Sequence, residues 1–329
     1  MKRIILGLLA ATAMTASAFA QDIKPALLFD LGGKFDKSFN EASYGGAEKF
    51  KAETGVEYVE FEISNDAQRE QALLRFAEEG RNPIVMAGFS WAAALDKVAK
   101  EFPDTKFAII DMVVDLPNVR SVVYKEQEGS YLVGILAAMA SQTKKVGFVG
   151  GMDIPLIRKF ACGYVGGAKS AGATEVIQNY TGDTPAAWND PTKGGEIAKS
   201  QISQGADVIY HAAGGTGVGV LQAAADEGKL GIGVDSNQNY LHPGKVLTSM
   251  LKRVDLAVYN AFNDAKSGNF ATGINVLGLK EDGVGYAVDD NNKALLTPEM
   301  LAAVEKAKAD IIAGTIEVAD FQQGNTCPY

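Results

Sequence analysis

Cysteine, histidine and tryptophan are scarce in this chain of 329 residues, which contains two of each. Neither His211 nor His242 lies in a metal-ligand spacing such as His-Glu-x-x-His, and no Gly-x-Ser-x-Gly elbow occurs. Each histidine is better explained as a strand or turn residue. The sequence therefore gives no motif for zinc or serine hydrolysis, and we expect no metal site, no cofactor and no enzymatic activity.

Apolar runs long enough to cross a bilayer are also missing. Lys2 and Arg3 precede a short apolar run, Ile4 to Ala11, and Ala18-Phe19-Ala20 supplies small residues for cleavage. This pattern predicts a signal peptide over residues 1–20, cleaved before Gln21. Because position 21 is not cysteine, no lipid anchor is expected. We predict an exported protein, located in the periplasm of a Gram-negative cell.

Positive charge is in the minority. The formal net charge is −9, and it becomes −11 when Lys2 and Arg3 leave with the signal peptide. An acidic chain is a poor partner for nucleic acid or for an anionic membrane. Cys162 and Cys327 are the only cysteines, and an exported compartment allows a disulfide between them. The sequence leaves open whether they are bridged or separate; a bridge would pin the C-terminal tail to a helix.

Short β-rich runs alternate with helical runs along most of the chain, as in parallel sheets built from βαβ units. Predicted strands are 24–29, 57–62, 84–87, 107–110, 119–124, 145–149, 175–180, 208–212, 231–234, 245–251 and about 283–288. Predicted helices are 39–53, 67–79, 91–102, 130–140, 157–171, 192–204, 218–227, 254–267 and 298–313. Two such series predict an α/β protein with two doubly wound parallel-sheet lobes.

The lobes are expected to exchange segments late in the chain. The simplest arrangement gives an N-terminal lobe of residues 22–126 plus about 250–280. Residues 127–249 plus about 281–329 then form a C-terminal lobe. The chain would cross between the lobes three times, forming a hinge. Neither a solenoid repeat nor a low-complexity linker interrupts this pattern.

The segment from Leu27 to Glu41 is the most informative part of the sequence. An apolar strand ends at Asp30, a glycine-bearing loop follows, and Ser38 with Glu41 predicts a capping box at a helix start. Phe39 and Asn40 then lie in the first helical turn, beside the carboxyl end of the strand, where open α/β sheets bind ligands. An aromatic ring beside an amide is suited to holding a nucleobase.

Polar residues and glycines follow several other predicted strands. Each of them has a plain structural explanation as a cap or turn, but their recurrence at strand ends favours one shared site. The residues are Asp30, Asp111, Gly214, Gly215, Asp235 and Lys252.

Further landmark segments are Asp36-Lys37-Ser38-Phe39-Asn40, Glu128 to Gly134, Asn189-Asp190-Pro191, Gly214-Gly215 and Gly233-Val234-Asp235-Ser236. Together these residues resemble the basic membrane protein family, the periplasmic nucleoside-binding components of ABC transporters. The resemblance covers essentially the whole mature chain. It implies a type I periplasmic binding fold that closes on a purine nucleoside such as adenosine, guanosine or inosine. It also implies ABC permease subunits as partners and membrane contact only through them. The sequence gives no sign of an oligomer, and we expect a monomer.

The resemblance assigns roles on the base side of the ligand. Phe39 looks like one stacking face, and Trp188 stands where the family commonly has phenylalanine. Asn40 and Asp111 would read the base edge, with Asp30 supporting them. The larger tryptophan leaves the preferred base open.

On the sugar side, Asp235 would accept hydrogen bonds from ribose hydroxyls and Lys252 would donate to the sugar. Gly214 and Gly215 would let the backbone approach the ligand closely. Unlike many family members, this chain lacks a cysteine after its signal peptide, so membrane tethering is not expected.

Other interpretations remain open at this point. Phe39 could face the core, and Lys252 could be an ordinary solvated charge. The same fold could bind a sugar or another polar solute, since sugar sites also use aromatic stacking. An acidic cluster of Asp30, Asp36 and Asp111 could hold a cation or activate water in a nucleoside-cleaving enzyme.

A dinucleotide-binding fingerprint is the weakest of the alternatives. Gly215-Thr216-Gly217 follows a predicted strand, but the third glycine of the pattern would fall at Val220, so the spacing fails.

Overall fold

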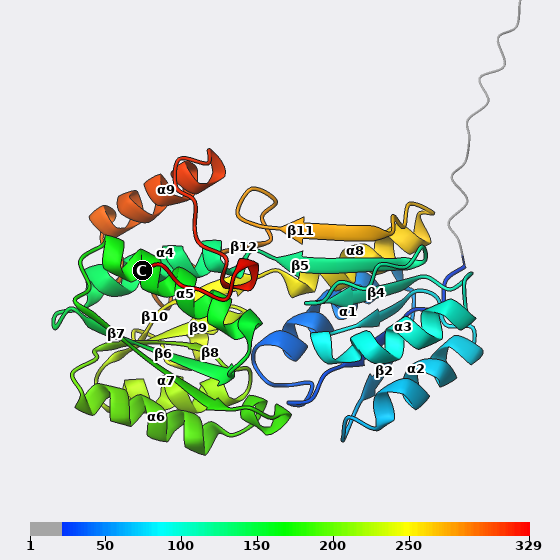
Figure 1. The fold of residues 1–329 in the computed structure, drawn as a ribbon, viewed down its shortest axis with the longest axis horizontal. Helices are drawn as coiled ribbons and strands as arrows, with labels where there is room; N and C mark the ends of the chain where they lie inside the picture. The colour runs from blue at the N-terminus through cyan, green and yellow to red at the C-terminus, as the bar shows by residue number, and fades with distance from the viewer. Residues whose placement is uncertain (1–21) are drawn as a thin grey trace, which may run out of the picture.

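The computed structural model describes residues 22–329, which form two α/β lobes lying side by side (Figure 1). The predicted signal peptide and its cleavage site lie outside the described residues. Each lobe is built around a six-stranded sheet covered by helices on both faces. No helix within residues 22–329 combines the length and apolarity needed to span a membrane.

The sheet of the first lobe is parallel throughout. Because successive side chains of a strand point to opposite faces, Leu27 and Phe29 of β1 join one core cluster while Ala26 and Leu28 join another. Helices α1 and α8 pack together over the first face, and α2 and α3 over the second. In spatial order the strands are β11 (Gly273–Leu277), β5 (Val119–Tyr124), β4 (Phe107–Ile110), β3 (Ile84–Met86), β1 (Ala26–Phe29) and β2 (Val59–Glu62); the helices are α1 (Phe39–Thr54), α2 (Gln68–Glu78), α3 (Ala92–Glu101) and α8 (Val254–Lys266).

The sheet of the second lobe is parallel except for its edge strand β12, which runs antiparallel to β10. Helices α4 and α5 cover one face together with α9, and α6 and α7 pack as a pair. In spatial order the strands are β12 (Val284–Tyr286), β10 (Val246–Lys252), β9 (Leu230–Asp235), β8 (Val208–Ala212), β6 (Lys145–Met152) and β7 (Glu175–Gly182); the helices are α4 (Glu126–Ala140), α5 (Pro155–Ser170), α6 (Pro191–Ser203), α7 (Thr216–Asp226) and α9 (Pro298–Ile312).

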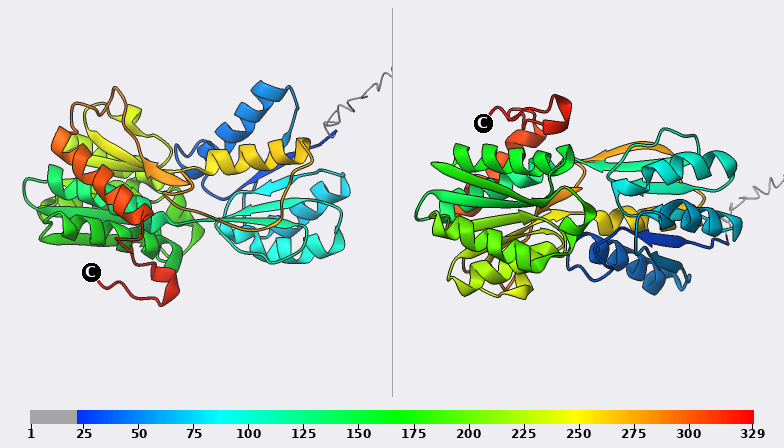
Figure 2. Two further views of the ribbon diagram at one scale, coloured as in Figure 1. Left: turned by 90° about the horizontal axis from the view of Figure 1, so that it is seen from above. Right: turned by 60° about the horizontal axis from the view of Figure 1, so that its bottom comes forward.

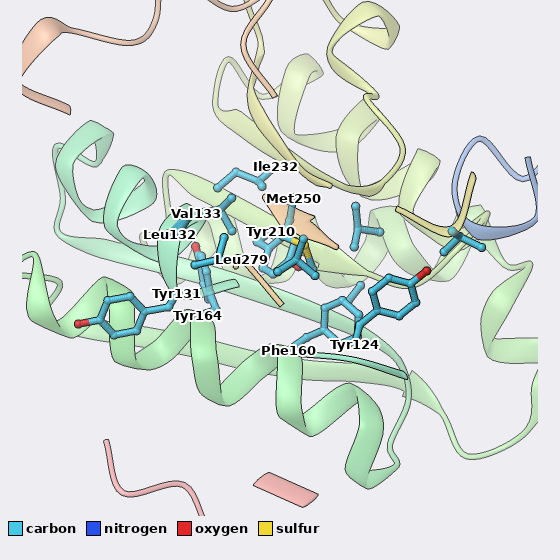
Figure 3. Close-up of a cluster of buried hydrophobic side chains, with 14 of the residues drawn as sticks. Tyr124, Tyr131, Leu132, Val133, Phe160, Tyr164, Tyr210, Ile232, Met250 and Leu279 are labelled. Carbon is cyan, nitrogen blue, oxygen red and sulfur yellow. The ribbon is translucent and has the colours of Figure 1, made fainter. Parts of the chain in front are cut away.

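Helices α4 and α5 approach so closely that glycine is required at the contact. A Cβ at Gly163 or Gly167 would collide with the backbone of Gln127 or Tyr131. Beneath this helix pair lies an aromatic cluster in which Tyr164 and Tyr210 have ring centroids 5.1 Å apart (Figure 3). The close contact with α4 and the aromatic cluster thus fix the position of α5 on the sheet of the second lobe.

Three segments join the lobes (Figure 2). Hydrogen bonds connect these segments to one another. They follow β5, β10 and β11. The Lys125 N–H donates to the Leu277 carbonyl at 3.0 Å, and the Arg253 N–H donates to the Gly283 carbonyl at 2.9 Å. Leu279 N–H donates to the Glu128 carboxylate at 2.8 Å. The crossing segments therefore form one bonded unit rather than three independent linkers.

Two late elements differ from the sequence expectation. Strand β11 was not predicted, because Ile274 and Val276 lie at an exposed sheet edge and give no buried alternation. Strand β10 stays in the second sheet as far as Lys252, slightly beyond the expected boundary near 250. The site described below depends on that extension.

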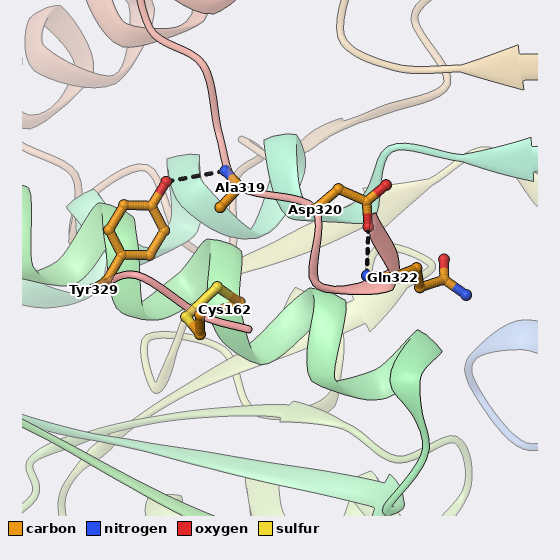
Figure 4. The surroundings of a disulfide bond; sticks show 6 residues. Cys162, Ala319, Asp320, Gln322 and Tyr329 are labelled. Atoms are coloured by element: carbon orange, nitrogen blue, oxygen red, sulfur yellow. Dashed lines mark hydrogen bonds between the residues drawn. A yellow bond between two sulfur atoms is a disulfide. The ribbon is translucent and has the colours of Figure 1, made fainter. Parts of the chain in front are cut away.

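Cys162 and Cys327, which the sequence left open, are joined in a disulfide (Figure 4). The bridge fastens the C-terminal tail to α5. Tyr329 packs over Gly166 of the same helix, and its hydroxyl accepts the Ala319 N–H at 3.0 Å.

We predict that Cys162→Ser lowers the free energy of unfolding by about 2–4 kcal/mol, because the bridge restricts the unfolded chain over a sequence separation of 165. Urea denaturation measures the loss. Cys327→Ser should give the same loss, and the double variant no more than either single one. Full additivity of the two variants would contradict a bridge.

Candidate functional site

One cavity lies where the carboxyl ends of strands from the two sheets face each other. It encloses about 600 Å³ of space, part of it open to solvent. Eight of the nine ligand residues predicted from the sequence line it, and Gly215 alone does not. The lining residues are Asp30, Leu31, Asp36, Phe39, Asn40, Gly88, Phe89, Asp111, Leu156, Ile157, Phe160, Trp188, Ala212, Ala213, Gly214, Val234, Asp235 and Lys252.

The start of α1 is capped differently from the prediction. The carboxylate of Asp36 accepts the backbone N–H groups of Ser38 at 2.8 Å, Asn40 at 3.0 Å and Glu41 at 3.1 Å. Glu41 accepts the Lys37 N–H at 3.2 Å, so the capping box predicted for Ser38 and Glu41 is wrong. Asp36 thus replaces Ser38 as the side chain that accepts the unpaired N–H groups at the helix start. Burial raises the pKa of Asp36 to about 7, although these N–H groups oppose the shift.

Asn40 holds the loop before α1. Its side-chain Nδ2 donates to the carbonyls of Asp30 at 3.2 Å and Gly33 at 3.1 Å, while its Oδ1 accepts the Asp30 N–H at 3.2 Å. Both N–H groups of the amide are therefore occupied. In this arrangement Asn40 positions the loop, and its expected contact with a base edge has no free donor.

Asp30 is held from behind by an arginine. Its Oδ1 pairs with Arg69 at 2.7 Å, and the Arg69 guanidinium lies over the Trp91 ring at 5.1 Å. Burial raises the pKa of Asp30, while the charge of Arg69 opposes that shift. Gly88 is needed here, because a Cβ at this position would collide with the Asp30 carboxylate.

The two predicted stacking rings come from different lobes and are both half-buried. Phe39 opens α1, and Trp188 ends a 3₁₀ turn, Pro185–Trp188. The indole ring of Trp188 packs over Gly151 of β6, where any Cβ would collide with its six-membered ring. Glycine at this position leaves room for the indole, which forms part of the cavity wall.

Lys252 is fully buried at the meeting point of the lobes, so it is not a solvated charge. Its Nζ lies 2.7 Å from Asp111 Oδ2 and 3.0 Å from Glu126 Oε1. Glu126 in turn lies 2.6 Å from Lys159 Nζ. These four residues, which we call the buried charge cluster, join β4, β10, α4 and α5. The Lys252 ammonium also lies 5.3 Å from the ring centre of Phe39.

Burial alone would lower the pKa of Lys252, but the carboxylates of Asp111 and Glu126 outweigh it and raise the pKa. Burial raises the pKa of Glu126, whereas the charges of Lys252 and Lys159 lower it below its usual value. Burial also raises the pKa of Asp111 to about 6, with the charge of Lys252 opposing the shift. Removing Lys252 would leave Asp111 buried without a cation and Glu126 with Lys159 alone.

Asp111 and Asp235 are the polar side chains of the cavity with binding capacity to spare. Oδ1 of Asp111 is buried without a hydrogen-bond partner, although Oδ2 is paired with Lys252. Asp235 uses its Oδ2 to accept the Ser38 hydroxyl at 2.5 Å. Both aspartates have left-handed backbone, with φ of 71° and 63°. Such a conformation is uncommon outside glycine and concentrates at functional sites.

The two glycines after β8 lie at different places relative to the cavity. Gly214, with φ of 55°, lines the cavity beside the Trp188 backbone. Gly215 precedes α7 and lies against the Trp188 carbonyl and Asp36, behind the cavity wall. Within residues 22–329, no group of three or more histidine, cysteine, aspartate or glutamate side chains is arranged to hold a metal ion.

Several site residues were not predicted from the sequence. Leu156, Ile157 and Phe160 of α5 line the cavity, but in sequence they belong to an ordinary apolar helix face. Glu126 and Lys159 lie behind the cavity and are buried. The sequence did not single out Glu126 or Lys159, because Glu128 and Arg158 lie close by in the same helices and only the structure shows which charges are buried and paired.

Two doubly wound lobes around a cavity at their strand ends are the architecture of a type I periplasmic binding protein. The family model for "ABC transporter substrate-binding protein PnrA-like" matches residues 23–320. The chain belongs to this family, and the predicted resemblance to the basic membrane proteins is confirmed.

Individual relatives agree with this placement. The chain is 36% identical to the ABC transporter nucleoside-binding protein BmpA of Lactococcus lactis, over 92% of this chain and 91% of the relative. It is also 36% identical to an uncharacterized lipoprotein of Pyrococcus furiosus, over 86% of this chain and 74% of the relative. A crystal structure of an ABC transporter solute-binding protein from Aeropyrum pernix has a TM-score of 0.84 at 32% identity, covering 92% of this chain and 95% of that one. The predicted fold class is thereby confirmed.

The name lipoprotein in one relative differs from the expectation for this chain, which has Gln21 rather than cysteine after the predicted cleavage site.

We predict that Lys252→Met lowers the free energy of unfolding of the ligand-free protein by about 3–5 kcal/mol, because two buried carboxylates lose their shared cation. Chemical denaturation measures the change. Lys97→Met, which removes an exposed pair with Glu70, is the matched control and should leave the free energy of unfolding nearly unchanged, because water screens that pair. Equal losses in the two variants would show that the buried cluster contributes nothing beyond a surface pair.

A second prediction concerns His211, which is fully buried in β8. Burial lowers its pKa from 6.5 to about 4, although the contact with Gln238 opposes the shift. The unfolded chain therefore binds a proton that the folded chain does not, and the free energy of unfolding falls as the pH drops from 7 to 4. At about 1.4 kcal/mol per pKa unit, the loss is roughly 3 kcal/mol. This loss of stability between pH 7 and pH 4 should be absent in His211→Gln, which has no imidazole to protonate.

Denaturation curves at pH 7 and pH 4 for wild type, His211→Gln and the control His242→Gln check this expectation. A wild-type loss no larger than that of His211→Gln would contradict a neutral buried imidazole.

Proposed function

We propose that this protein captures a purine nucleoside between its lobes and delivers it to the permease subunits of an ABC importer, acting as a monomer in the periplasm. One observation carries the proposal. Two half-buried rings from different lobes, Phe39 and Trp188, share a cavity with Asp111, whose Oδ1 is buried and unpartnered. A flat heterocycle that presents N–H groups at its edge complements that combination.

The magnitudes are sufficient for capture. Stacking of a base on an aromatic ring contributes about 1–3 kcal/mol. Each hydrogen bond to a charged group adds about 1.5–3 kcal/mol. Micromolar binding needs about 8 kcal/mol in total. Two stacked faces with hydrogen bonds to Asp111 and Asp235 reach this value if lobe closure excludes water.

The charge of the cavity favours an uncharged ligand. Its wall carries four carboxylates, from Asp30, Asp36, Asp111 and Asp235, and one cation, Lys252. That cation is already paired with Asp111 and Glu126. A phosphate group would meet excess negative charge with no free cation, so we propose that nucleosides bind and nucleotides do not.

The relatives support the proposal. The Lactococcus lactis protein named a nucleoside-binding protein aligns with this chain over nearly its whole length. We propose that the present protein acts by binding without chemical change, because capture for transport needs no further reaction.

Calorimetry with adenosine, guanosine, inosine, uridine, ribose and AMP tests the proposal. We expect micromolar or tighter binding of at least one purine nucleoside and no binding of AMP. Ribose binding without any nucleoside response would overturn the nucleoside assignment in favour of a sugar. Chromatography of the incubated nucleoside separates a receptor from an enzyme, because release of the free base would contradict binding alone.

We further predict that Phe39→Leu weakens all bound nucleosides by about 10- to 100-fold, since one stacking face is lost. Binding isotherms measure the loss. Phe61→Leu, at a partly exposed site of β2 outside the cavity, is the control and should leave affinity unchanged. A change limited to one base would show that Phe39 reads base identity instead of supplying a general stacking surface.

A further inference from the structure

Buried hydrogen bonds connect the lobes directly at the start of α1. The Ser38 hydroxyl donates to Asp235 Oδ2 at 2.5 Å, and Ser38 is fully buried. The Ser236 hydroxyl donates to the Ser38 carbonyl at 3.1 Å. Gln238 Nε2 donates to the Lys37 carbonyl at 3.0 Å. We call these five residues, two from the first lobe and three from the second, the clasp.

The first-lobe half of the clasp is freed from helix capping. Asp36 caps α1, so the Ser38 side chain makes no capping bond although it stands at the N-cap. Lys37 has left-handed backbone, with φ of 62°. This turn directs the Lys37 carbonyl and the Ser38 hydroxyl toward the second lobe. A lysine in that conformation has a cost that its surroundings must offset, as at functional sites.

The second-lobe half is fixed by its own hydrogen bonds. Oε1 of Gln238 accepts the Val234 N–H at 2.9 Å and lies 2.9 Å from His211 Nε2. The Gln238 N–H donates to the Ser249 hydroxyl at 2.9 Å. The Gln238 amide is thereby oriented so that only its Nε2 group faces the first lobe. The second lobe presents a rigid receptor for the Lys37–Ser38 turn.

Asp235 belongs both to the clasp and to the cavity wall. We propose that Ser38 is a positioning residue that couples lobe closure to ligand retention by holding the Asp235 carboxylate in its ligand-binding orientation. The Ser38 hydroxyl reaches Asp235 only while the lobes are together. Separation of the lobes breaks this hydrogen bond and opens the cavity wall at Asp235 to water, so the grip on the ligand and the closed arrangement support each other.

This inference rests on the proposed function and deepens it. A charge-assisted hydrogen bond is worth about a 10- to 100-fold change in an equilibrium constant. Ser38→Ala should therefore weaken nucleoside binding by about that factor, mainly through faster dissociation, because the clasp must break before the lobes can part and release the ligand. Stopped-flow displacement measures the rate. Ser43→Ala is the matched control, since Ser43 is also buried in α1 but bonds only to the Phe39 carbonyl of its own helix.

A double-mutant cycle separates positioning from a general structural effect. If Ser38 acts through Asp235, adding Ser38→Ala to Asp235→Asn costs less than about a further 2-fold in affinity. Independent losses that multiply would overturn the proposal. Ser236→Ala, which removes only the second hydrogen bond to Ser38, should shift dissociation in the same direction by a smaller factor and provides a second variant if Ser38→Ala folds poorly.

Small-angle X-ray scattering provides a test that needs no nucleoside. Ligand-free Ser38→Ala should have a larger radius of gyration than ligand-free wild type, because the closed arrangement loses a cross-lobe bond. Scattering identical to wild type, together with an unchanged dissociation rate, would overturn the clasp. If wild type binds no nucleoside, the proposed function fails by calorimetry, and the scattering comparison still decides whether the clasp holds the lobes together.

Discussion

The buried charge cluster is the constraint on which the rest of the structure depends. Lys252 comes from the last position of a strand in the second sheet, yet it pairs with Asp111 of the first sheet and with Glu126 at the first crossing segment. Buried ion pairs are not reliably a source of net stability, because desolvation offsets much of their attraction. Their geometric effect is stronger: any shift of one lobe that separates these partners exposes an unpaired charge to an apolar interior. The cluster therefore specifies how the lobes meet.

The cavity follows from this arrangement, and its polar groups fall into two kinds. Asp36, Asn40 and Lys252 already make hydrogen bonds or ion pairs within the protein. Asp36 holds the start of α1, Asn40 holds the loop before it, and Lys252 holds the junction of the lobes. Asp111 and Asp235 retain acceptor capacity on the cavity wall. Folding has already fixed the orientation of these groups. The free-energy cost of rearranging them when a ligand binds is therefore small. Asp235 belongs to both the clasp and the cavity wall, so the hydrogen bonds of the clasp also orient a side chain of the cavity.

The sequence predicted the architecture well and the hydrogen bonding poorly. Alternating strands and helices were readable because each buried strand and amphipathic helix carries its own local pattern. Strand β11 escaped notice because an exposed edge strand lacks that pattern. The capping box failed because Asp36 and Ser38 are both good caps, and the choice between them depends on Asp235, nearly two hundred residues away. Asn40 was predicted to read the base edge, and no local pattern indicated that the loop before α1 would occupy both N–H groups of its amide.

By itself the sequence determined the two-lobe α/β fold, the acidic character of the chain, and the polar residues that end its strands, since these depend on local periodicity, composition and position. Only the tertiary structure decided which of those residues remain available to a ligand. Three sets of contacts join positions far apart in the chain. They pair Lys252 with Asp111 and Glu126, Arg69 with Asp30, and Ser38 with Asp235. Burial imposes these contacts, because a charge removed from water is stable only beside a partner. No local sequence pattern shows which residues will lie close together in space.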